Sequence, residues 1–170
     1  NALDADPDFA LASVGLARAC QYAGDMASAK AAIAQARDAA RPVDAREASH
    51  INAFDLSRSG KTAQAYAAIR AHVDSYPRDA VVAQTCSSVF GLIGFSGQPG
   101  REAELLAYTN SLLPHYGDDW WMLSQHAFSL CETGQLARAG QMIDRSLAAN
   151  AKSAHSAHIR SHVYYEEGNL

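Results

Sequence analysis

The sequence is poor in cysteine and proline and has no long apolar run. Its three cysteines are widely separated and odd in number, which excludes a disulfide framework and a Cys-x-x-Cys zinc site. We expect all three, Cys20, Cys86 and Cys131, to be small buried apolar residues. No apolar run approaches the length that spans a bilayer, so we expect no membrane association. With only five prolines in 170 residues, long helices can form without interruption.

An excess of basic residues and a catalytic motif are also absent. The chain has 14 Lys and Arg against 18 Asp and Glu, so its net charge of −4 offers no basic footprint for nucleic acid. There is no nucleophile elbow, P-loop or dinucleotide fingerprint, and the glycine-rich "GLIGFSGQPG" lacks the Gly-Lys-Ser/Thr ending of a phosphate loop. We therefore predict a protein that is not an enzyme and has no cofactor. Because the chain starts at Asn1 without methionine, we interpret it as part of a longer polypeptide, with a cytoplasmic location.

Alanine is abundant, and it has the highest helix propensity of all residues. Four glycines, Gly24, Gly60, Gly134 and Gly168, follow one another at intervals of 36, 74 and 34 residues. The middle interval is about two units, so the period is close to the ~34 residues of a helical-hairpin repeat.

Other positions repeat with the same register. An alanine lies five residues after each of the first three glycines, and an isoleucine lies nine residues after each. Small residues allow two helices to approach closely, and larger ones fill the space beside them. These columns are Ala29, Ala65 and Ala139, and Ile33, Ile69 and Ile143.

The sequence therefore predicts an all-α fold, an α-solenoid of helix-turn-helix repeats with a right-handed superhelix and about nine helices. We predict a single repeat domain over residues 1–170, with units at 8–43, 44–78, 79–117, 118–151 and, incomplete, 152–170. In the third unit the glycine-rich segment predicts a lengthened loop between two helices. The expected helices are 8–23, 26–40, 44–58, 62–75, 79–93, 101–113, 118–133, 136–149 and 152–167.

The segment "DPDFALASVGLARACQYAGDMASAKAAIAQA" resembles the tetratricopeptide repeat through its small, large, Gly-Asp and alanine positions. Three further phrases, "REASHINAFDLSRSGKTAQAYAAIRAHVDSYPRDA", "HAFSLCETGQLARAGQMIDRSLAAN" and "AHIRSHVYYEEG", resemble the tetratricopeptide repeat protein 38 family. The sequence differs from that family at Cys131, where the family tends to have glutamate, and at His155, where it tends to have tryptophan. The resemblance implies an architecture more than an activity. The matching residues are His50, Ala127, Phe128, Glu132, Thr133, His158 and His162.

In such arrays the first helix of each pair lines the inner, concave surface, and residues spaced by three and four share one face of a helix. The face expected to line this groove is rich in aromatic, histidine and charged side chains, as recognition surfaces are. We therefore predict a scaffold that binds a protein or peptide segment, including one from its own longer chain, and neither nucleic acid nor membrane. The predicted groove residues are Tyr22, His50, Phe54, Arg58, Trp121, Phe128, Glu132, His155, His158, His162, Tyr165 and Glu166.

Two alternatives stay open at this stage. Phe54 and Phe128 can equally pack against a neighbouring helix. His158 and His162, one helical turn apart, can bind a metal ion with Glu132, as a metal-binding module or a metal-assisted hydrolase.

The remaining histidines lie outside the expected groove. His72 and His115 are expected to be surface or capping residues, and His126 to pack between helices. Of the adjacent Trp120 and Trp121, one is expected in the core or at a joint between helices.

Overall fold

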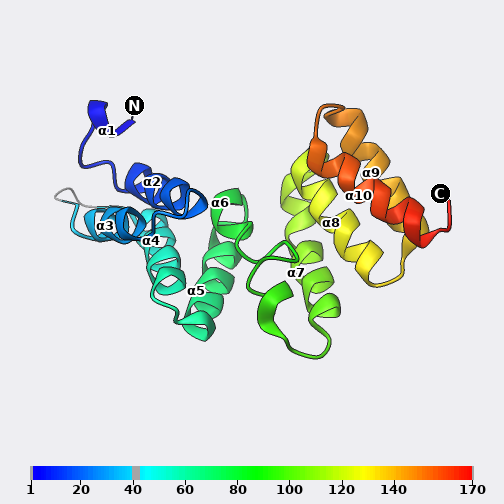
Figure 1. Cartoon of the computed structure of the whole chain (residues 1–170), viewed down its shortest axis with the longest axis horizontal. Coiled ribbons are helices and arrows are strands. Elements are labelled where there is room, and N and C mark those ends of the chain that lie inside the picture. Colours follow the sequence, from blue (N-terminus) through cyan, green and yellow to red (C-terminus); the bar gives the residue numbers. More distant parts are fainter. Residues whose placement is uncertain (1, 40–42, 170) are drawn as a thin grey trace. The chain divides into compact units, whose positions relative to one another are not determined.

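The computed structural model describes residues 2–39 and 43–169, and the regular elements in these ranges are all helices. The chain forms two compact units, Asn1–Val82 and Ala83–Leu170, whose elements are labelled in Figure 1. The first unit contains α1 (Ala2–Ala5), α2 (Ala10–Tyr22), α3 (Met26–Arg37), α4 (Ala45–Arg58) and α5 (Thr62–Ser75), and it ends within α6 (Ala80–Ala83). The second contains η1 (Gly94–Ser96), α7 (Arg101–Tyr116), α8 (Trp120–Glu132), α9 (Leu136–Ala149) and α10 (Ala154–Glu166).

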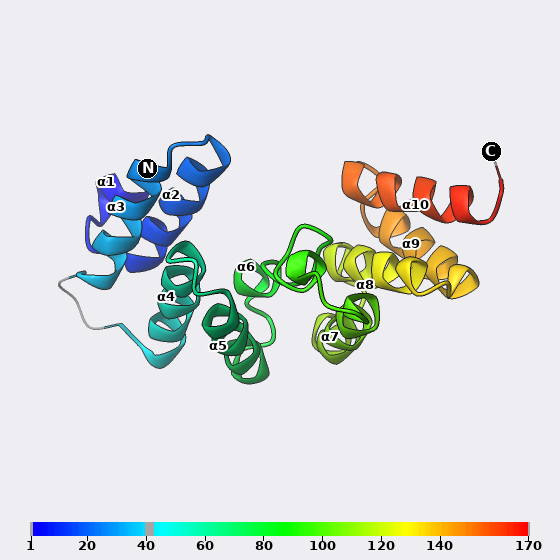
Figure 2. The same ribbon diagram turned by 60° about the horizontal axis from the view of Figure 1, so that its bottom comes forward.

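The first unit is built from two helical hairpins, α2–α3 and α4–α5, and α4 also packs against α2 and α3 (Figure 2). Gly24 and Gly60 make the tight turns with φ of 80° and 68°, a left-handed conformation that glycine adopts without a steric penalty. Asp25 and Asp44 begin α3 and α4 by accepting hydrogen bonds from backbone amides of the first turn.

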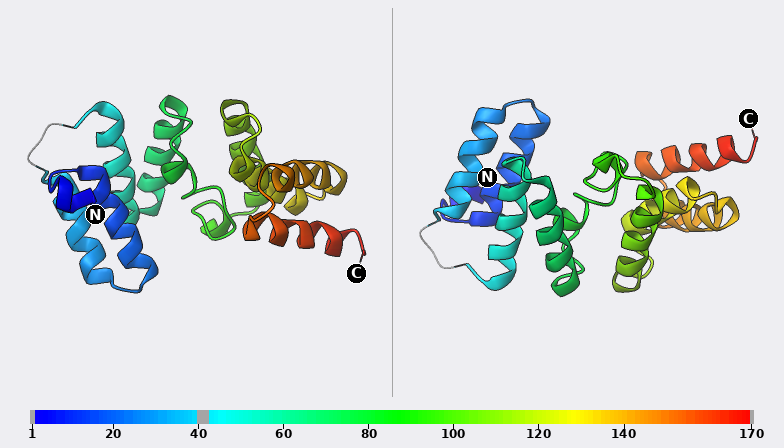
Figure 3. Two further views of the ribbon diagram at one scale, coloured as in Figure 1. Left: turned by 90° about the horizontal axis from the view of Figure 1, so that it is seen from above. Right: turned by 90° about the horizontal axis from the view of Figure 1, so that it is seen from below.

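The second unit repeats this construction. α8 and α9 form a hairpin, α7 packs against α8, and α10 packs against both α8 and α9 (Figure 3). Asp119 caps α8 and Ser153 caps α10. A core cluster joins these helices, consisting of Leu130, Cys131, Ala139 and Val163 with Leu106, Leu136 and Met142 packed against it.

The repeating columns lie where helices cross. Ala29, Ala65 and Ala139 each have 0% of their surface exposed, as the repeat register predicts. The isoleucines of the second column, Ile33, Ile69 and Ile143, are at most 3% exposed. Of the cysteines, Cys86 and Cys131 are buried as expected, whereas Cys20 is partly exposed.

The predicted helix 79–93 is wrong. α6 ends at Ala83, and residues 84–100 form turns and the short η1. Serine, threonine and β-branched residues at 85–89 favour a helix only weakly, and a close backbone approach follows them. A Cβ at Gly94 would lie 2.2 Å from the carbonyl oxygen of Val89, a contact that a helix does not make. The expected lengthened loop is therefore longer still and begins earlier.

Other helix limits differ by smaller amounts. α7 continues through Pro114 to Tyr116, beyond the expected end at residue 113. The four-residue α1 precedes the first predicted helix. The end of the predicted helix 26–40 falls at residue 40, outside the described residues. Within the part of the chain that the structure describes, no helix has both the length and the apolar character needed to cross a bilayer.

Candidate functional site

The second unit contains a pocket of about 610 Å³. One wall is α8, a second is α10, and the third is the irregular segment 84–90. Its lining combines aromatic side chains, three histidines and a carboxylate. The lining residues are Gln84, Ser88, Val89, Phe90, Trp120, Trp121, Gln125, Phe128, Glu132, His155, His158, Ile159 and His162.

The α8 wall follows from helical periodicity. Trp121, Gln125, Phe128 and Glu132 are spaced by four, three and four residues and therefore share one face of the helix. The Gln125 side-chain oxygen accepts a hydrogen bond of 3.0 Å from the buried Ser87 hydroxyl, which fixes the segment 84–90 against α8.

The segment 84–90 also contributes an exposed aromatic edge. The Phe90 side chain lines the pocket although it is 81% exposed, and its ring centroid lies 5.7 Å from that of Phe95. An aromatic side chain with this exposure leaves much apolar area for a ligand to cover.

His155 is held in one tautomer by Ser124. The Ser124 hydroxyl donates its proton to the Trp121 carbonyl oxygen at 2.7 Å, so its contact of 3.2 Å with His155 Nδ1 requires the ring nitrogen to donate. Partial burial, assisted by the neighbouring His158, lowers the pKa of His155. Near neutral pH this ring is therefore uncharged, with Nε2 available as an acceptor.

His158 and His162 are coupled on α10. Their Nε2 atoms lie 3.1 Å apart, so one ring donates to the other, and the ring of His162 also meets that of Phe128 edge to face at a centroid distance of 6.1 Å. Both histidines and Glu132 also line a second hollow, which continues along α10 to Tyr165 and Glu166. The two hollows thus share one wall.

The structure brings together every predicted groove residue of the second unit around these adjoining hollows, although Phe128 is only 8% exposed and therefore also packs in the core. That they bind a ligand stays a prediction. The residues are Trp121, Phe128, Glu132, His155, His158, His162, Tyr165 and Glu166.

In the part of the chain that the structure describes, the alternative metal site on α10 has two close ligands, His158 and His162. Among the described residues, Glu132 does not form a compact three-ligand group with His158 and His162. Metal binding or hydrolysis at this pair stays a prediction.

In the first unit, the predicted groove residues His50 and Phe54 are buried, and for Phe54 this agrees with the alternative that it packs against a neighbouring helix. Both side chains are 5% exposed, and their rings stack at a centroid distance of 5.1 Å. His50 is buried because its Nδ1 lies 3.0 Å from a carboxylate oxygen of the buried Asp79, which satisfies the ring away from water.

The other two predicted residues of this unit differ from each other. Tyr22 is 75% exposed, and its hydroxyl accepts a hydrogen bond from Arg18 at 3.2 Å. Arg58 is half-buried, and this burial lowers the pKa of its guanidinium.

Sequence reasoning missed two parts of these sites, the pocket wall at residues 84–90 and the burial of His72. His72, expected at the surface or as a cap, is 2% exposed; Ala65, Ile69 and His72 are spaced by four and three residues and form one buried face of α5. That spacing was a signal for its burial. Trp120 and Trp121 both line the pocket, and Trp121 also packs at the joint between α7 and α8, with its ring centroid 5.6 Å from that of Tyr116, as expected for one of the two. His126 is buried, as expected for a packing residue, and its Nδ1 lies 3.0 Å from the Thr109 hydroxyl.

Comparisons with known proteins support the architecture. No protein-family model matches the chain, and no curated protein matches it. Among solved structures it is similar to a tetratricopeptide repeat protein from Parabacteroides merdae ATCC 43184, with a TM-score of 0.61 and 17% sequence identity over 94% of this chain. The chain spans 60% of the length of that protein.

A likeness at this identity concerns the fold. Membership of the tetratricopeptide repeat protein 38 family, the handedness of the superhelix and the single-domain organisation stay predictions. The all-helical structure and its solved neighbour together confirm that the chain is an α-solenoid of helical repeats of the tetratricopeptide type.

Proposed function

We propose that the second unit binds a protein or peptide segment in the pocket between α8, α10 and residues 84–90. The observation that carries this proposal is the pocket itself, which has 610 Å³ of space and a lining rich in aromatic side chains. A pocket with apolar walls and a few oriented polar groups is the usual form of a ligand site. Helical-repeat folds commonly present extended binding surfaces to protein segments.

The chemistry of the walls indicates what kind of segment fits. Trp121 and Phe128 provide an apolar floor that suits one bulky apolar side chain. Glu132 belongs to both hollows and lies in the pocket with this floor, and Glu166 adds a second carboxylate in the adjoining hollow. We propose a segment with an apolar anchor followed by a lysine or arginine, because a basic group pairs with these carboxylates.

The experiment is a selection from a displayed peptide library on the untagged protein, followed by affinity measurement for the selected peptides. The matched pair of variants is Phe90→Ala, at the pocket, and Tyr22→Ala, an exposed aromatic residue of the first unit. Loss of an aromatic contact at a binding site costs ~1–2 kcal/mol, so Phe90→Ala weakens binding about tenfold while Tyr22→Ala has no effect.

A second substitution tests the charge preference. Glu132→Gln keeps the shape of the side chain and removes its charge, so peptides with a basic residue bind more weakly and peptides without one are unaffected. If no peptide is selected, or if Phe90→Ala and Glu132→Gln bind the selected peptides as the wild type does, the pocket is not the binding site.

A further inference from the structure

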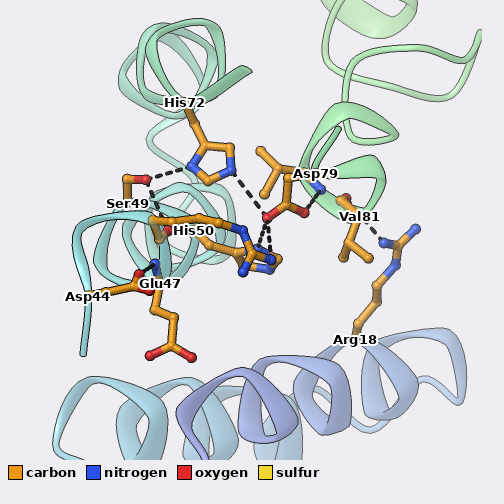
Figure 4. Close-up of polar contacts among 10 residues, drawn as sticks. Arg18, Asp44, Glu47, Ser49, His50, His72, Asp79 and Val81 are labelled. Carbon is orange, nitrogen blue, oxygen red and sulfur yellow. Dashed lines mark hydrogen bonds and ion pairs between the residues drawn. The ribbon is translucent and has the colours of Figure 1, made fainter. Parts of the chain in front are cut away.

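A second cluster of chemically active side chains belongs to the first unit, whereas the pocket belongs to the second. Asp79, in the turn before α6, is surrounded by His50 from α4 and His72 from α5 (Figure 4). One oxygen of Asp79 lies 3.0 Å from His50 Nδ1 and 3.3 Å from His72 Nε2. The three potential ligand atoms all lie within 4.8 Å of one another, and all three residues are buried.

Ser49 makes a short contact with the ring of His72. The Ser49 hydroxyl donates its single proton to the Arg46 carbonyl oxygen at 3.1 Å. The same hydroxyl lies 2.5 Å from His72 Nδ1 (Figure 4), and while its proton is on the carbonyl oxygen the ring nitrogen is the donor in this contact. In the neutral ring, Nε2 then carries a lone pair.

This lone pair is directed at a negative group. His72 Nε2 is buried, has no hydrogen-bond partner among the described residues, and lies 3.3 Å from the oxygen of Asp79. Two electron-rich atoms at this distance repel each other unless a positive species lies between them. That species is either a proton on Nε2 or a metal ion.

We propose that His50, His72 and Asp79 bind a divalent transition-metal ion, with zinc as the best match. Two imidazole nitrogens and one carboxylate oxygen are a ligand set for zinc and for related first-row ions. Ser49 acts as a positioning residue, because a hydrogen bond to the distal nitrogen orients a histidine ligand and sets its tautomer. His50 binds through Nδ1 once its proton has moved to Nε2.

The ion would connect three successive elements, α4, α5 and the turn that leads into α6. Each of these contributes one ligand, so the ion stabilises the folded first unit relative to the unfolded chain, where no preformed site exists. Three protein ligands leave one position for water. This inference does not depend on the proposed peptide pocket, whose residues all belong to the second unit.

Arg46 competes with the metal for the same oxygen. Its guanidinium lies 3.2 Å from Asp79 Oδ2, and its side chain is 45% exposed, so it can move into solvent when a cation binds. Removing its charge therefore strengthens metal binding. A cluster that serves only as a hydrogen-bonded ion pair gives the opposite result, because it loses a partner of Asp79.

The experiment is titration of zinc alone into the untagged full chain after treatment with a chelator, by isothermal calorimetry and by thermal unfolding. We expect one equivalent to bind and the unfolding temperature to rise with zinc concentration. His72→Gln and Ser49→Ala weaken binding at least tenfold, within the range known for ligand and outer-shell changes. The control is the double variant His158→Ala with His162→Ala, which removes the histidine pair on α10. It is expected to bind one equivalent of zinc, as the wild type does.

Arg46→Gln tests the proposal even if His72→Gln fails to fold. Arg46 is exposed, so its replacement is not expected to disturb folding. The proposal requires about tenfold tighter zinc binding in this variant, as expected for removing a nearby like charge. The proposal is overturned if no saturable equivalent binds, if the control loses it, or if Arg46→Gln binds zinc no more tightly. It is equally overturned if nuclear magnetic resonance shows His72 protonated on both nitrogens in the presence of zinc.

Discussion

Replacing Ala139 by phenylalanine tests the packing that defines the repeats. Ala139 has no exposed surface and lies in the core cluster with Leu130, Cys131 and Val163, none of which is more than 6% exposed. A phenyl ring has no free space here, so α9 must move away from α8 and α10. Overpacking of a closed core costs ~1–3 kcal/mol and occasionally more, and we expect a value at the upper end because the added group is large.

Ala137→Phe is the matched control, because Ala137 is exposed on the same helix. Both variants lose the same helix propensity, about 0.5 kcal/mol, so the difference between them isolates the packing cost. The two tryptophans of the chain, Trp120 and Trp121, both lie on α8, so their fluorescence reports unfolding of the second unit in urea. Equal losses of stability in the two variants, or no loss in Ala139→Phe, would refute the register of the repeat.

Two further changes have predictable signs. Gly94→Ala places a Cβ 2.2 Å from the Val89 carbonyl oxygen and costs at least ~1–3 kcal/mol in urea unfolding, whereas Gly97→Ala, with open space but a φ of 67°, costs only about 1 kcal/mol. Burial lowers the pKa of His126, so the unfolded state takes up a proton first as the pH falls below about 6.5 and the wild type loses up to ~1 kcal/mol per pH unit. His126→Gln cannot titrate, so its free energy of unfolding falls less steeply between pH 7 and 5. If the fall is as steep as in the wild type, His126 is not the group responsible.

Much of the fold could be predicted because the packing residues of helical repeats recur at fixed intervals in the sequence. Small and large residues at constant distances from Gly24, Gly60 and Gly134 identify the crossings of helices, and these distances are local. The same periodicity placed the α8 and α10 side chains on the faces that line the pocket. Information of this kind needs no knowledge of distant contacts.

The wrong prediction of a helix at 79–93 has the opposite cause, because that segment depends on contacts without a periodic pattern. Residues 84–93 contain enough apolar side chains to suggest a helix, but the backbone of Val89 instead approaches Gly94, and the Leu92 amide donates to the Thr85 carbonyl oxygen at 2.9 Å. These contacts belong to the folded loop and have no periodic signature. The third wall of the pocket was consequently absent from the predicted site.

His50 and His158 show why a position in a repeat does not determine the exposure of a side chain. Each lies ten residues before the turn glycine of its unit, Gly60 or Gly168, so both occupy the same place on the first helix of a pair. His158 is exposed at the pocket, whereas His50 is buried against Asp79, a residue 29 positions later in the sequence. A buried imidazole requires such a partner, because an unsatisfied polar group away from water costs about 1–3 kcal/mol. The repeat fixes the direction of the side chain, and the next connection decides whether that side chain stays accessible to a ligand or becomes part of a closed cluster.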